Sequence, residues 1–288
     1  MLENQTILVT GGAGFIGSHL VEALAGIGNN RVISLDNYST GSTENHMPGA
    51  EYIEGHTRDV AELCPVVPDL VYHLGEYSRV ERSFEDMELV WDLNKVGTFG
   101  VLEYCRLHGI KLVYAGSSTK FADGGLGRDQ SPYAWTKATN TELVMNYGRW
   151  FGLRYAISYF YNVYGPREIT DGAYATVLGI FRRQHAAGQP LTVVAPGSQR
   201  RNFTHVEDIV RGLTLVGEQG LGDEYGLGAE QSHSVMEIAD LFGAEIKMLA
   251  ERQGNRMNAH LDVGKSKLLG WRAERSVEDY IRDAISSS

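Results

Sequence analysis

The feature that most constrains this chain is a glycine-rich stretch near its N-terminus, Thr10–Gly17. An apolar run, residues 7–9, precedes it, and apolar residues at helical spacing follow over residues 18–24. This order predicts a buried strand, a tight turn and a helix. Glycine lets the backbone turn sharply and approach a pyrophosphate, whose charge the amides at a helix N-terminus stabilise. The stretch, with glycines at 11, 14 and 17, therefore predicts the phosphate-binding turn of a dinucleotide site.

An acidic residue ends the next predicted strand, which covers residues 31–35 and runs into Asp36 and Asn37. A carboxylate at this place accepts hydrogen bonds from both hydroxyls of an adenosine ribose and repels a 2′-phosphate. This favours NAD over NADP as the cofactor. The alternative is that Asp36 is only an acidic turn residue. Asp59 follows a short third strand, residues 52–54, and is expected at the adenine edge.

Predicted strands and helices alternate along the chain. Further strands are expected at residues 70–74 and 111–115, with a helix over 90–108 between them. This alternation predicts an α/β fold, a Rossmann-type doubly wound parallel sheet whose ligands lie beyond the carboxyl ends of the strands. We expect a cofactor-binding domain at 1–165, with a segment at about 205–242 returning to it. A smaller C-terminal lobe, 166–288, is interleaved with that domain and is expected to bind the substrate.

Composition excludes several classes of function. No run approaches the roughly 18 apolar residues that a membrane span requires, and the first predicted strand begins too early for a signal peptide. The two cysteines, Cys64 and Cys105, have no metal-binding or redox spacing and suit a reducing compartment. A net charge of −10 argues against nucleic acid as a partner. We therefore expect a cytoplasmic protein with no metal, no membrane contact and no nucleic acid.

A second motif, Tyr133-x-x-x-Lys137, opens a helix that is predicted to run to about Phe151, with Ser131 as its N-cap and Pro132 in its first turn. Residues four apart share one helix face. A tyrosine has a pKa near 10, but a neighbouring ammonium and a cationic nicotinamide ring favour the phenolate. Tyr133 is thus a candidate base for a substrate hydroxyl.

A hydroxyl at the end of the preceding strand is expected to assist Tyr133. Ser118 or Thr119 would hydrogen-bond the same substrate oxygen and orient it. A Tyr-x-x-x-Lys pair taken alone is more often surface or core. Its position after a glycine-turn domain and a Ser-Ser-Thr strand end favours the catalytic interpretation.

These motifs together resemble the extended short-chain dehydrogenase/reductase family, in particular its nucleotide-sugar epimerases and dehydratases. The resemblance runs nearly from end to end. The residues that carry it are Thr10–Gly17, Asp36-Asn37, His73-Leu74, Asn94 with Gly97-Thr98, Ser117-Ser118-Thr119, Tyr133 with Lys137, and residues 161–167, 201–208 and 268–271.

The resemblance implies two sets of binding residues. For NAD they are Gly11, Gly14, Phe15, Ile16, Gly17, Asp36, Asn37, Asp59, Leu74, Gly75, Tyr133 and Lys137. For a nucleoside diphosphate-sugar they are Glu76, Thr119, Asn162, Arg201, Arg252 and Ala259. Two arginines from different segments can grip phosphate oxygens with charge-assisted forks, although either arginine can equally be a surface charge.

The resemblance also bears on the reaction. Dehydratases of the family place an acid pair after the catalytic threonine, but here Lys120 and Phe121 follow Thr119, and the glutamate typical of the decarboxylases is missing from this stretch. What remains suits a 4-epimerase, which oxidises C4, rotates the 4-keto sugar and returns the hydride to its other face. A small residue at 259 would leave room for an N-acetyl group, so UDP-N-acetylhexosamines are candidates beside UDP-hexoses. The alternatives are a dehydratase, decarboxylase or reductase and, less favoured, a non-catalytic NAD-binding protein.

Two further departures concern the site. Only 14 positions separate Thr119 from Tyr133, so the sugar pocket is expected to be more open than in relatives. Glu76 stands where the family usually has alanine. It could bind a sugar hydroxyl or supply an acid/base for a dehydratase-type reaction, but pairing with Arg79 or Arg82 is favoured.

Relatives of this family usually dimerise through two helices from each subunit. The corresponding helices here, 90–108 and 133–151, carry extra aromatic residues. A homodimer is therefore expected, mainly by analogy.

Overall fold

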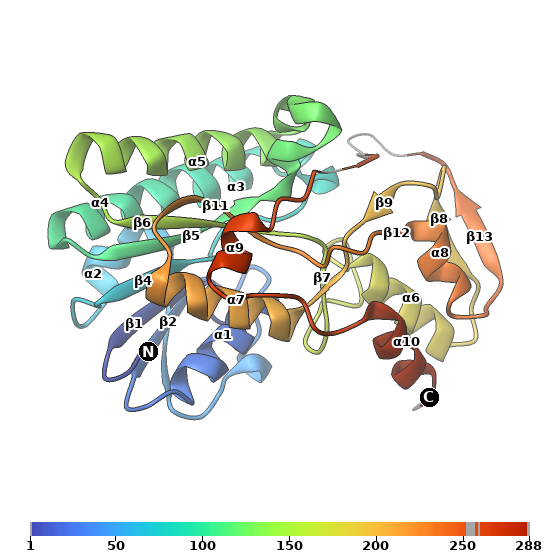
Figure 1. Ribbon diagram of the computed structural model, residues 1–288, viewed down its shortest axis with the longest axis horizontal. Coiled ribbons are helices and arrows are strands. Elements are labelled where there is room, and N and C mark those ends of the chain that lie inside the picture. The colour runs from blue at the N-terminus through green and yellow to red at the C-terminus, as the bar shows by residue number, and fades with distance from the viewer. Residues whose placement is uncertain (1, 252–256, 259, 287–288) are drawn as a thin grey trace.

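The structure is a computed structural model that describes residues 2–251, 257–258 and 260–286. A large domain built on one sheet lies beside a smaller lobe (Figure 1). The sheet has seven strands in the order β11-β6-β5-β4-β1-β2-β3, and every neighbouring pair is parallel. Its strands are β1 (Thr6–Thr10), β2 (Arg31–Asp36), β3 (Ala50–Glu54), β4 (Leu70–His73), β5 (Lys111–Ser117), β6 (Tyr155–Phe160) and β11 (Gly222–Leu227).

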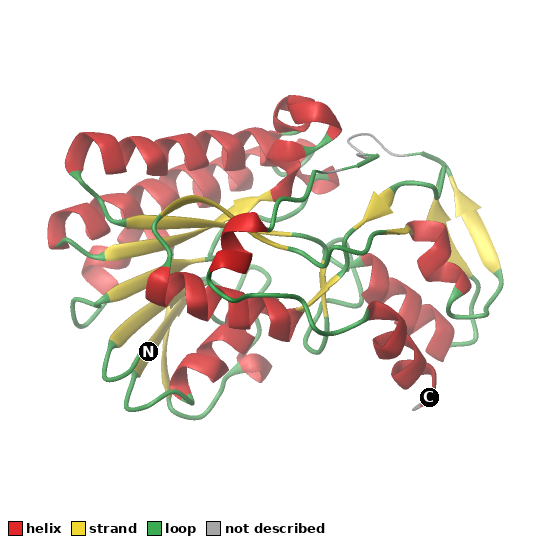
Figure 2. Ribbon diagram, in the orientation of Figure 1, coloured by secondary structure: helices red, strands yellow, loops and turns green. Residues whose placement is uncertain are grey.

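The strand order reverses between β1 and β4, which is the topological switch point where α/β sheets of this kind bind ligands. Helices cover both faces of the sheet (Figure 2). On one face are α1 (Phe15–Ala25) and α7 (Val206–Gln219), and on the other are α2 (Val60–Leu63), α4 (Thr98–His108) and α5 (Pro132–Phe151). The predicted α/β doubly wound fold is confirmed.

The strand β1 shows why this sequence forms a sheet covered on both sides. Ile7 and Val9 lie in the core against α1 and α7, whereas Leu8 lies in the core against α4 and α5, and all three are fully buried. Side chains alternate between the two faces of a strand. A sheet buried on both faces needs apolar residues at consecutive positions, as this run supplies.

The predicted helix over 90–108 is continuous with one further turn at its start. The α-helical turn α3 (Met87–Val90) leads into a π-helical stretch, η4 (Trp91–Gly97), and then into α4. A π turn inside a helix often marks a functional site. Here it places Asn94 so that its Oδ1 accepts a hydrogen bond from the Tyr77 N–H at 2.7 Å.

The smaller lobe has its own apolar core, to which Phe181, Leu191, Ile238 and Ile281 contribute. Its elements are α6 (Val177–Ala186), β8 (Leu191–Val194), β13 (Ile246–Leu249), α8 (Val235–Asp240) and α10 (Val277–Ser286). Short strands are β7 (Val163–Tyr164), β9 (Arg200–Arg201), β10 (Thr204–His205) and β12 (His233–Ser234). Short 3-10 segments are η1 (Thr43–Asn45), η2 (Thr57–Asp59), η3 (Glu81–Phe84), η5 (Ser118–Phe121) and η6 (Asp123–Asp129), the last of which is kinked at Gly124 and Gly125.

The chain passes between the two parts more often than the sequence division implies. The segment α7–β11 returns to the large sheet, whereas α8, which follows it within residues 205–242, packs in the lobe core. After β13 the chain returns once more as α9 (Gly264–Leu268), and Trp271 is buried against α7, where its Nε1 donates to the Asp208 carbonyl at 2.7 Å. No helix in the described residues is long and apolar enough to cross a membrane.

Candidate active site

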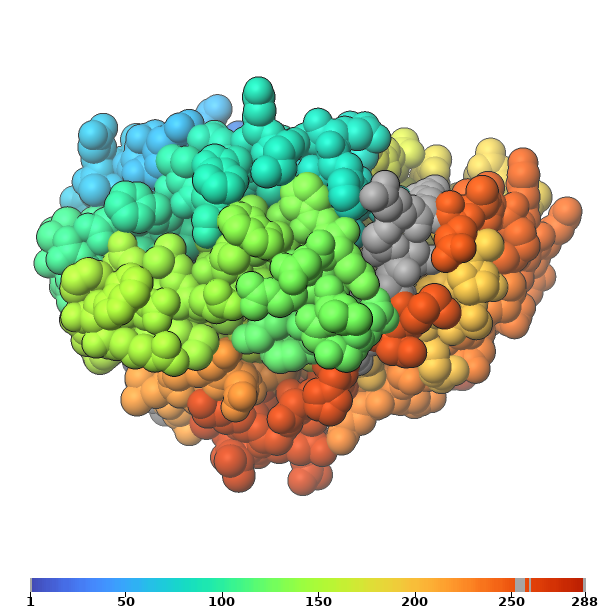
Figure 3. Space-filling model, turned by 90° about the horizontal axis from the view of Figure 1, so that it is seen from above, coloured from blue at the N-terminus to red at the C-terminus, as the bar shows by residue number. Residues whose placement is uncertain are grey.

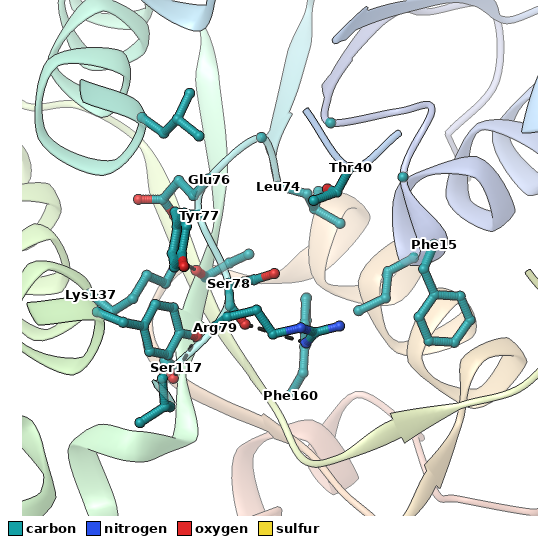
Figure 4. Close-up of a pocket in the computed structure, with 18 of the residues that line it drawn as sticks. Phe15, Thr40, Leu74, Glu76, Tyr77, Ser78, Arg79, Ser117, Lys137 and Phe160 are labelled. Carbon is teal, nitrogen blue, oxygen red and sulfur yellow. Dashed lines mark hydrogen bonds and ion pairs between the residues drawn. The ribbon is translucent and has the colours of Figure 1, made fainter. Parts of the chain in front are cut away.

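A cleft lies at the carboxyl ends of the central strands, where the large domain meets the lobe. Residues of the glycine turn, the end of β2, the loop after β4, the end of β5 and the start of α5 line it, together with Asn162 and Arg201. Figure 4 shows the part of this cleft around Glu76, Ser117 and Lys137. The cleft brings together most of the residues that the sequence marked as cofactor- or substrate-binding.

In the glycine turn, Gly11 and Gly17 have no room for a side chain. Gly11 has φ +72°, and a Cβ on it would lie 2.8 Å from the backbone nitrogen of Gly75. A Cβ on Gly17 would lie 2.0 Å from the Gly11 carbonyl oxygen. Gly14 is the N-cap residue of α1, so the free amides of the first helical turn lie next to the turn. This arrangement fits the pyrophosphate of a dinucleotide.

Asp36 lies at the end of β2 with its carboxylate held on both oxygens. Oδ2 accepts the Ala13 N–H at 2.9 Å, and Oδ1 accepts the Tyr38 N–H at 2.9 Å. Burial raises the pKa of the Asp36 carboxyl, and these backbone hydrogen bonds offset part of that rise. A carboxylate has about four lone-pair sites, so Asp36 can still accept the two ribose hydroxyls of NAD. Asn37 lines the cleft beside it.

Asp59, expected at the adenine edge, does not line the cleft. It ends the short turn η2, and its side chain is 49% exposed beside Arg58, at an N–O separation of 3.8 Å. Leu74 and Gly75 do line the cleft, as do Phe15 and Ile16. The neighbour Thr57 supplies the cleft wall that the sequence analysis assigned to Asp59.

Tyr133 lies in the first turn of α5 and points its hydroxyl at the end of β5. The Tyr133 hydroxyl donates to Ser117 Oγ at 3.1 Å, and Ser117 Oγ lies 2.8 Å from Thr119 Oγ1. The predicted partners, Ser118 and Thr119, also line the cleft, but the hydroxyl that contacts Tyr133 directly is that of Ser117. Ser117 is therefore the site residue that the sequence analysis missed, although it stands in the same Ser-Ser-Thr motif.

Lys137 lies one helical turn after Tyr133 and is buried, with 5% of its surface exposed. Its Nζ donates to the Ala115 carbonyl oxygen, and it forms an ion pair with Glu76. The ring of Tyr114 lies under the ammonium, 4.6 Å from Nζ to the ring centroid. An ammonium has three donors, so one remains to face the cleft that Lys137 lines.

Glu76 does not pair with Arg79 or Arg82, so that prediction was wrong. Its side chain is 3% exposed, and Oε1 accepts from three groups on three elements: Thr98 Oγ1 at 2.8 Å, Asn140 Nδ2 at 3.0 Å and Tyr114 OH at 3.1 Å. Burial by itself would raise the pKa of the Glu76 carboxyl. The charge of Lys137, with His73 and the hydrogen bonds of Lys137 and Thr98, outweighs burial and lowers it.

A chain of hydrogen bonds connects Glu76 to the base of the glycine turn. Because the Thr98 hydroxyl donates to Glu76, it accepts from His73 Nε2, 3.0 Å away. His73 Nδ1 lies 2.7 Å from Thr10 Oγ1, which in turn accepts the Gly75 N–H at 3.0 Å. When the Thr10 hydroxyl donates to Nδ1, His73 is neutral with its proton on Nε2. Burial lowers the pKa of His73 to about 4, in keeping with that state.

Arg79 enters the cleft from the same loop as Glu76, and Figure 4 shows its guanidinium extending into the cavity. It donates to the Tyr174 carbonyl and, at 3.4 Å, to the Ser78 carbonyl, while its buried Nε has no partner. Burial lowers the pKa of the Arg79 guanidinium. Within the described residues no carboxylate pairs with it, so Arg79 offers an uncompensated positive charge to whatever occupies the cleft.

Asn162 and Arg201 extend the cleft into the lobe. Asn162 has φ +40°, a conformation that asparagine tolerates better than most residues. The guanidinium of Arg201 donates to the Arg200 carbonyl at 2.8 Å and the Met257 carbonyl at 3.3 Å. Arg252 and Ala259, the other predicted substrate residues, lie outside the described residues.

Lys120, which stands where dehydratases of the family carry an acid, points away from the cleft. Its Nζ donates to Tyr159 OH at 2.8 Å and pairs with Asp223 at 3.3 Å. The segment between Thr119 and Tyr133, predicted to leave the site open, still contributes Ala122, Gly127 and Gln130 to the cleft wall. In the described residues no three His, Cys, Asp or Glu side chains come together as metal ligands.

The fold and the site define an α/β protein that binds a dinucleotide and sets a Tyr–Lys pair beside it. Residues 7–228 match the model of the NAD dependent epimerase/dehydratase family. The chain belongs to this family, and NAD is its cofactor.

Individual relatives differ in the reaction they are named for. A putative UDP-glucose 4-epimerase of Methanocaldococcus jannaschii is 33% identical over 97% of each chain. UDP-glucuronic acid decarboxylase 6 of Arabidopsis thaliana is 32% identical over 93% of this chain and 84% of that protein. Among solved structures, the Thermus thermophilus UDP-glucose 4-epimerase complex with NAD superposes with a TM-score of 0.86, at 29% identity and 98% coverage of both chains. The family is therefore shown, and the reaction is a separate question.

Proposed function

We propose that the protein is an NAD-dependent nucleotide-sugar 4-epimerase acting on a UDP-hexose or UDP-N-acetylhexosamine. One observation carries this proposal. Tyr133, Ser117 and Lys137 form a complete hydroxyl-activating group on the cleft wall, whereas Glu76 and Lys120, which could serve a dehydration, are held in ion pairs with Lys137 and Asp223. A 4-epimerase needs no acid or base beyond the tyrosine.

The residues of the cleft divide the work as follows. When bound, NAD supplies the acceptor and donor for the hydride of the sugar carbon. Tyr133 takes the proton of the 4-hydroxyl, and Ser117, hydrogen-bonded to Tyr133, orients the same oxygen. The positive charge of Lys137 favours the phenolate of Tyr133. The 4-keto sugar then rotates so that it presents its opposite face. Tyr133 returns the proton to the 4-oxygen, which gives the sugar with inverted configuration at C4.

The diphosphate of the substrate is assigned to the lobe side of the cleft. Arg201 and Asn162 line that side, and the names of the relatives point to UDP-linked sugars. Guanidinium groups bind phosphate oxygens through paired, charge-assisted hydrogen bonds. The net charge of −10 makes such local positive groups necessary for an anionic substrate.

A homodimer is part of the proposal. Trp91 and Trp135 stack on each other, 6.1 Å between ring centroids and 13° between planes, yet they remain 46% and 39% exposed. Phe99, Trp150 and Phe151 on the same helices are each more than half exposed. Figure 3 looks onto the side of the molecule that α5 covers. Large exposed aromatic groups clustered on one side are typical of a protein interface.

Sedimentation of the wild type and of Trp91→Glu tests the homodimer. A dimer that the substitution converts to a monomer supports it, and a monomeric wild type contradicts it.

The reaction is tested by incubating the NAD-loaded protein with UDP-, dTDP-, GDP- and CDP-sugars in D2O. We expect an isomer of unchanged mass, inverted at C4 and free of solvent deuterium, from one or more UDP-sugars. Tyr133→Phe should retain NAD and lose turnover. Loss of water with deuterium incorporated, or loss of carbon dioxide, would overturn the epimerase proposal in favour of a dehydratase or decarboxylase. NAD binding without turnover of any sugar would favour a binding protein.

A further inference from the structure

Beneath the cleft wall, the Glu76–Lys137 ion pair joins a carboxylate to the lysine of the Tyr–Lys pair. We propose that Glu76 is a positioning residue: it fixes the Lys137 ammonium in the wall and offsets its charge, so that Tyr133 ionises readily only when the positive nicotinamide ring of NAD lies beside it. This inference rests on the proposed role of Tyr133.

The Glu76–Lys137 ion pair is rigid. Glu76 is held through Thr98 on α4, Tyr114 on β5 and Asn140 on α5, and Asn140 also donates to the Asn94 carbonyl at 2.6 Å. The Glu76 side chain is almost fully buried, so it cannot move away from Lys137, and the Lys137 ammonium stays in place in the cleft wall. A buried charge pair whose partners are all hydrogen-bonded keeps its geometry.

Glu76 also changes the electrostatic effect that Lys137 has on Tyr133. A lysine next to a tyrosine favours the phenolate because opposite charges attract. A carboxylate bonded to that lysine repels the phenolate and cancels most of this effect, since the pair has no net charge. Glu76 is hydrogen-bonded to the Lys137 ammonium, so its charge acts on Tyr133 together with that of Lys137.

The other titratable groups around the pair do not replace Glu76 in this role. His73 on β4 is neutral, and Tyr114 on β5 keeps its proton because burial and Glu76 hold its pKa well above the usual range. Lys95 on η4 lies beyond Asn140, to whose Oδ1 its Nζ donates at 2.7 Å. Arg79 stands on the cleft side, where its charge also interacts with Tyr133, but it does so equally in the wild type and in Glu76 variants. Glu76 is thus the carboxylate that directly opposes Lys137 within the described residues.

The test is a spectroscopic titration of Tyr133 that needs no sugar substrate. The near-ultraviolet absorbance of phenolate is followed against pH in the NAD-loaded protein, and the signal of Tyr133 is isolated by subtracting Tyr133→Phe. In Glu76→Gln the midpoint should fall by on the order of one pH unit, because the negative charge that offsets the Lys137 ammonium has been removed. Glu76→Asp restores the charge and should return the midpoint toward that of the wild type.

Tyr114→Phe is the matched control, because it removes one hydrogen bond to Glu76 without changing any charge. It should leave the midpoint in place. The proposal is overturned if Glu76→Gln leaves the midpoint unchanged or raises it, or if Tyr114→Phe shifts it equally.

A second measurement uses only the wild type and so does not depend on how well Glu76→Gln folds. The Tyr133 midpoint is compared with and without NAD. We expect the midpoint to be at least about one pH unit higher without NAD, because the positive nicotinamide ring that favours the phenolate is then absent. A midpoint near neutrality without NAD would contradict the proposal. Since neither titration contains a sugar, a failed epimerase assay would leave both results standing.

Discussion

The hydroxyl of Tyr133 lies 3.1 Å from Oγ of Ser117, which is the first of the three hydroxyl-bearing residues in the Ser-Ser-Thr motif. Ser117 is the last residue of β5, whereas Ser118 and Thr119 already belong to the turn η5. Thr119 Oγ1 lies 2.8 Å from Ser117 Oγ and so acts on Tyr133 only through it.

Ser117→Ala should therefore lower kcat more than Ser118→Ala. We expect a loss of about 100-fold for Ser117→Ala, in the range typical of groups that assist proton transfer, and a smaller loss for Ser118→Ala. Steady-state kinetics on the sugar that the panel identifies provides the measurement. An equal or larger loss in Ser118→Ala would mean that the substrate oxygen contacts Ser118 instead.

The predicted residues that the structure places together at the cleft are set by local spacing. The glycine turn needs only a strand, three glycines and a helix in succession, and Lys137 shares a helix face with Tyr133 because four residues make about one turn. Asp36 follows from the end of a strand that is itself evident from its apolar run.

The parts that were missed depend on long-range packing. The partner of Glu76, Lys137, lies 61 positions away on α5. Arg79 and Arg82 are much nearer in the sequence, and spacing alone therefore favours them. The choice of Ser117 over Ser118 depends on where β5 ends, and strand boundaries are the least certain part of any sequence-based prediction. Asp59 failed for a similar reason, since a short turn carries its side chain away from the cleft.

Asp36 should control both the affinity and the choice of cofactor. Asp36→Asn removes the charge that binds the ribose hydroxyls, and a hydrogen bond to a charged group contributes about 1.5–3 kcal/mol. We expect the dissociation constant of NAD to rise at least about 10-fold, with a relative gain for NADP because the repulsion of its phosphate is gone. Calorimetric titration with both cofactors measures this. Asp59→Asn is the matched control and should leave both constants unchanged; an equal effect there would restore Asp59 to the site.

Arg79 should bind an anionic group in the cleft. Its guanidinium is buried with only carbonyl partners, and a buried cation without an anion is unfavourable. Arg79→Met should therefore weaken the binding of NAD or of UDP by about 10-fold or more without lowering the melting temperature. Separate titrations with NAD and UDP identify which ligand loses affinity. Arg82→Met, which affects an arginine already paired with Glu85, is the control. Unchanged affinity for both ligands in Arg79→Met would contradict this prediction.

His73 should make the stability of the fold sensitive to acid. Burial lowers its pKa in the folded state from 6.5 to about 4. Between these two values the unfolded chain binds a proton that the folded chain does not, so the free energy of unfolding must decrease as the pH falls through this range. The full effect is about 3 kcal/mol, and it is complete once the pH is below the folded pKa.

Denaturant unfolding at a series of pH values between 7 and 4 tests this effect, with His73→Asn and His108→Asn as the variants. His73→Asn lowers stability at neutral pH, because it disturbs the hydrogen bonds to Thr10 and Thr98, but it should flatten the dependence on pH. His108 is exposed at the end of α4, and its replacement should leave the slope intact. If His73→Asn kept the wild-type slope, the acid sensitivity would have to come from other groups, such as His19 and His205, whose pKa burial also lowers. The lowered pKa of Glu76 places its own loss of stability at a lower pH, below 4.5.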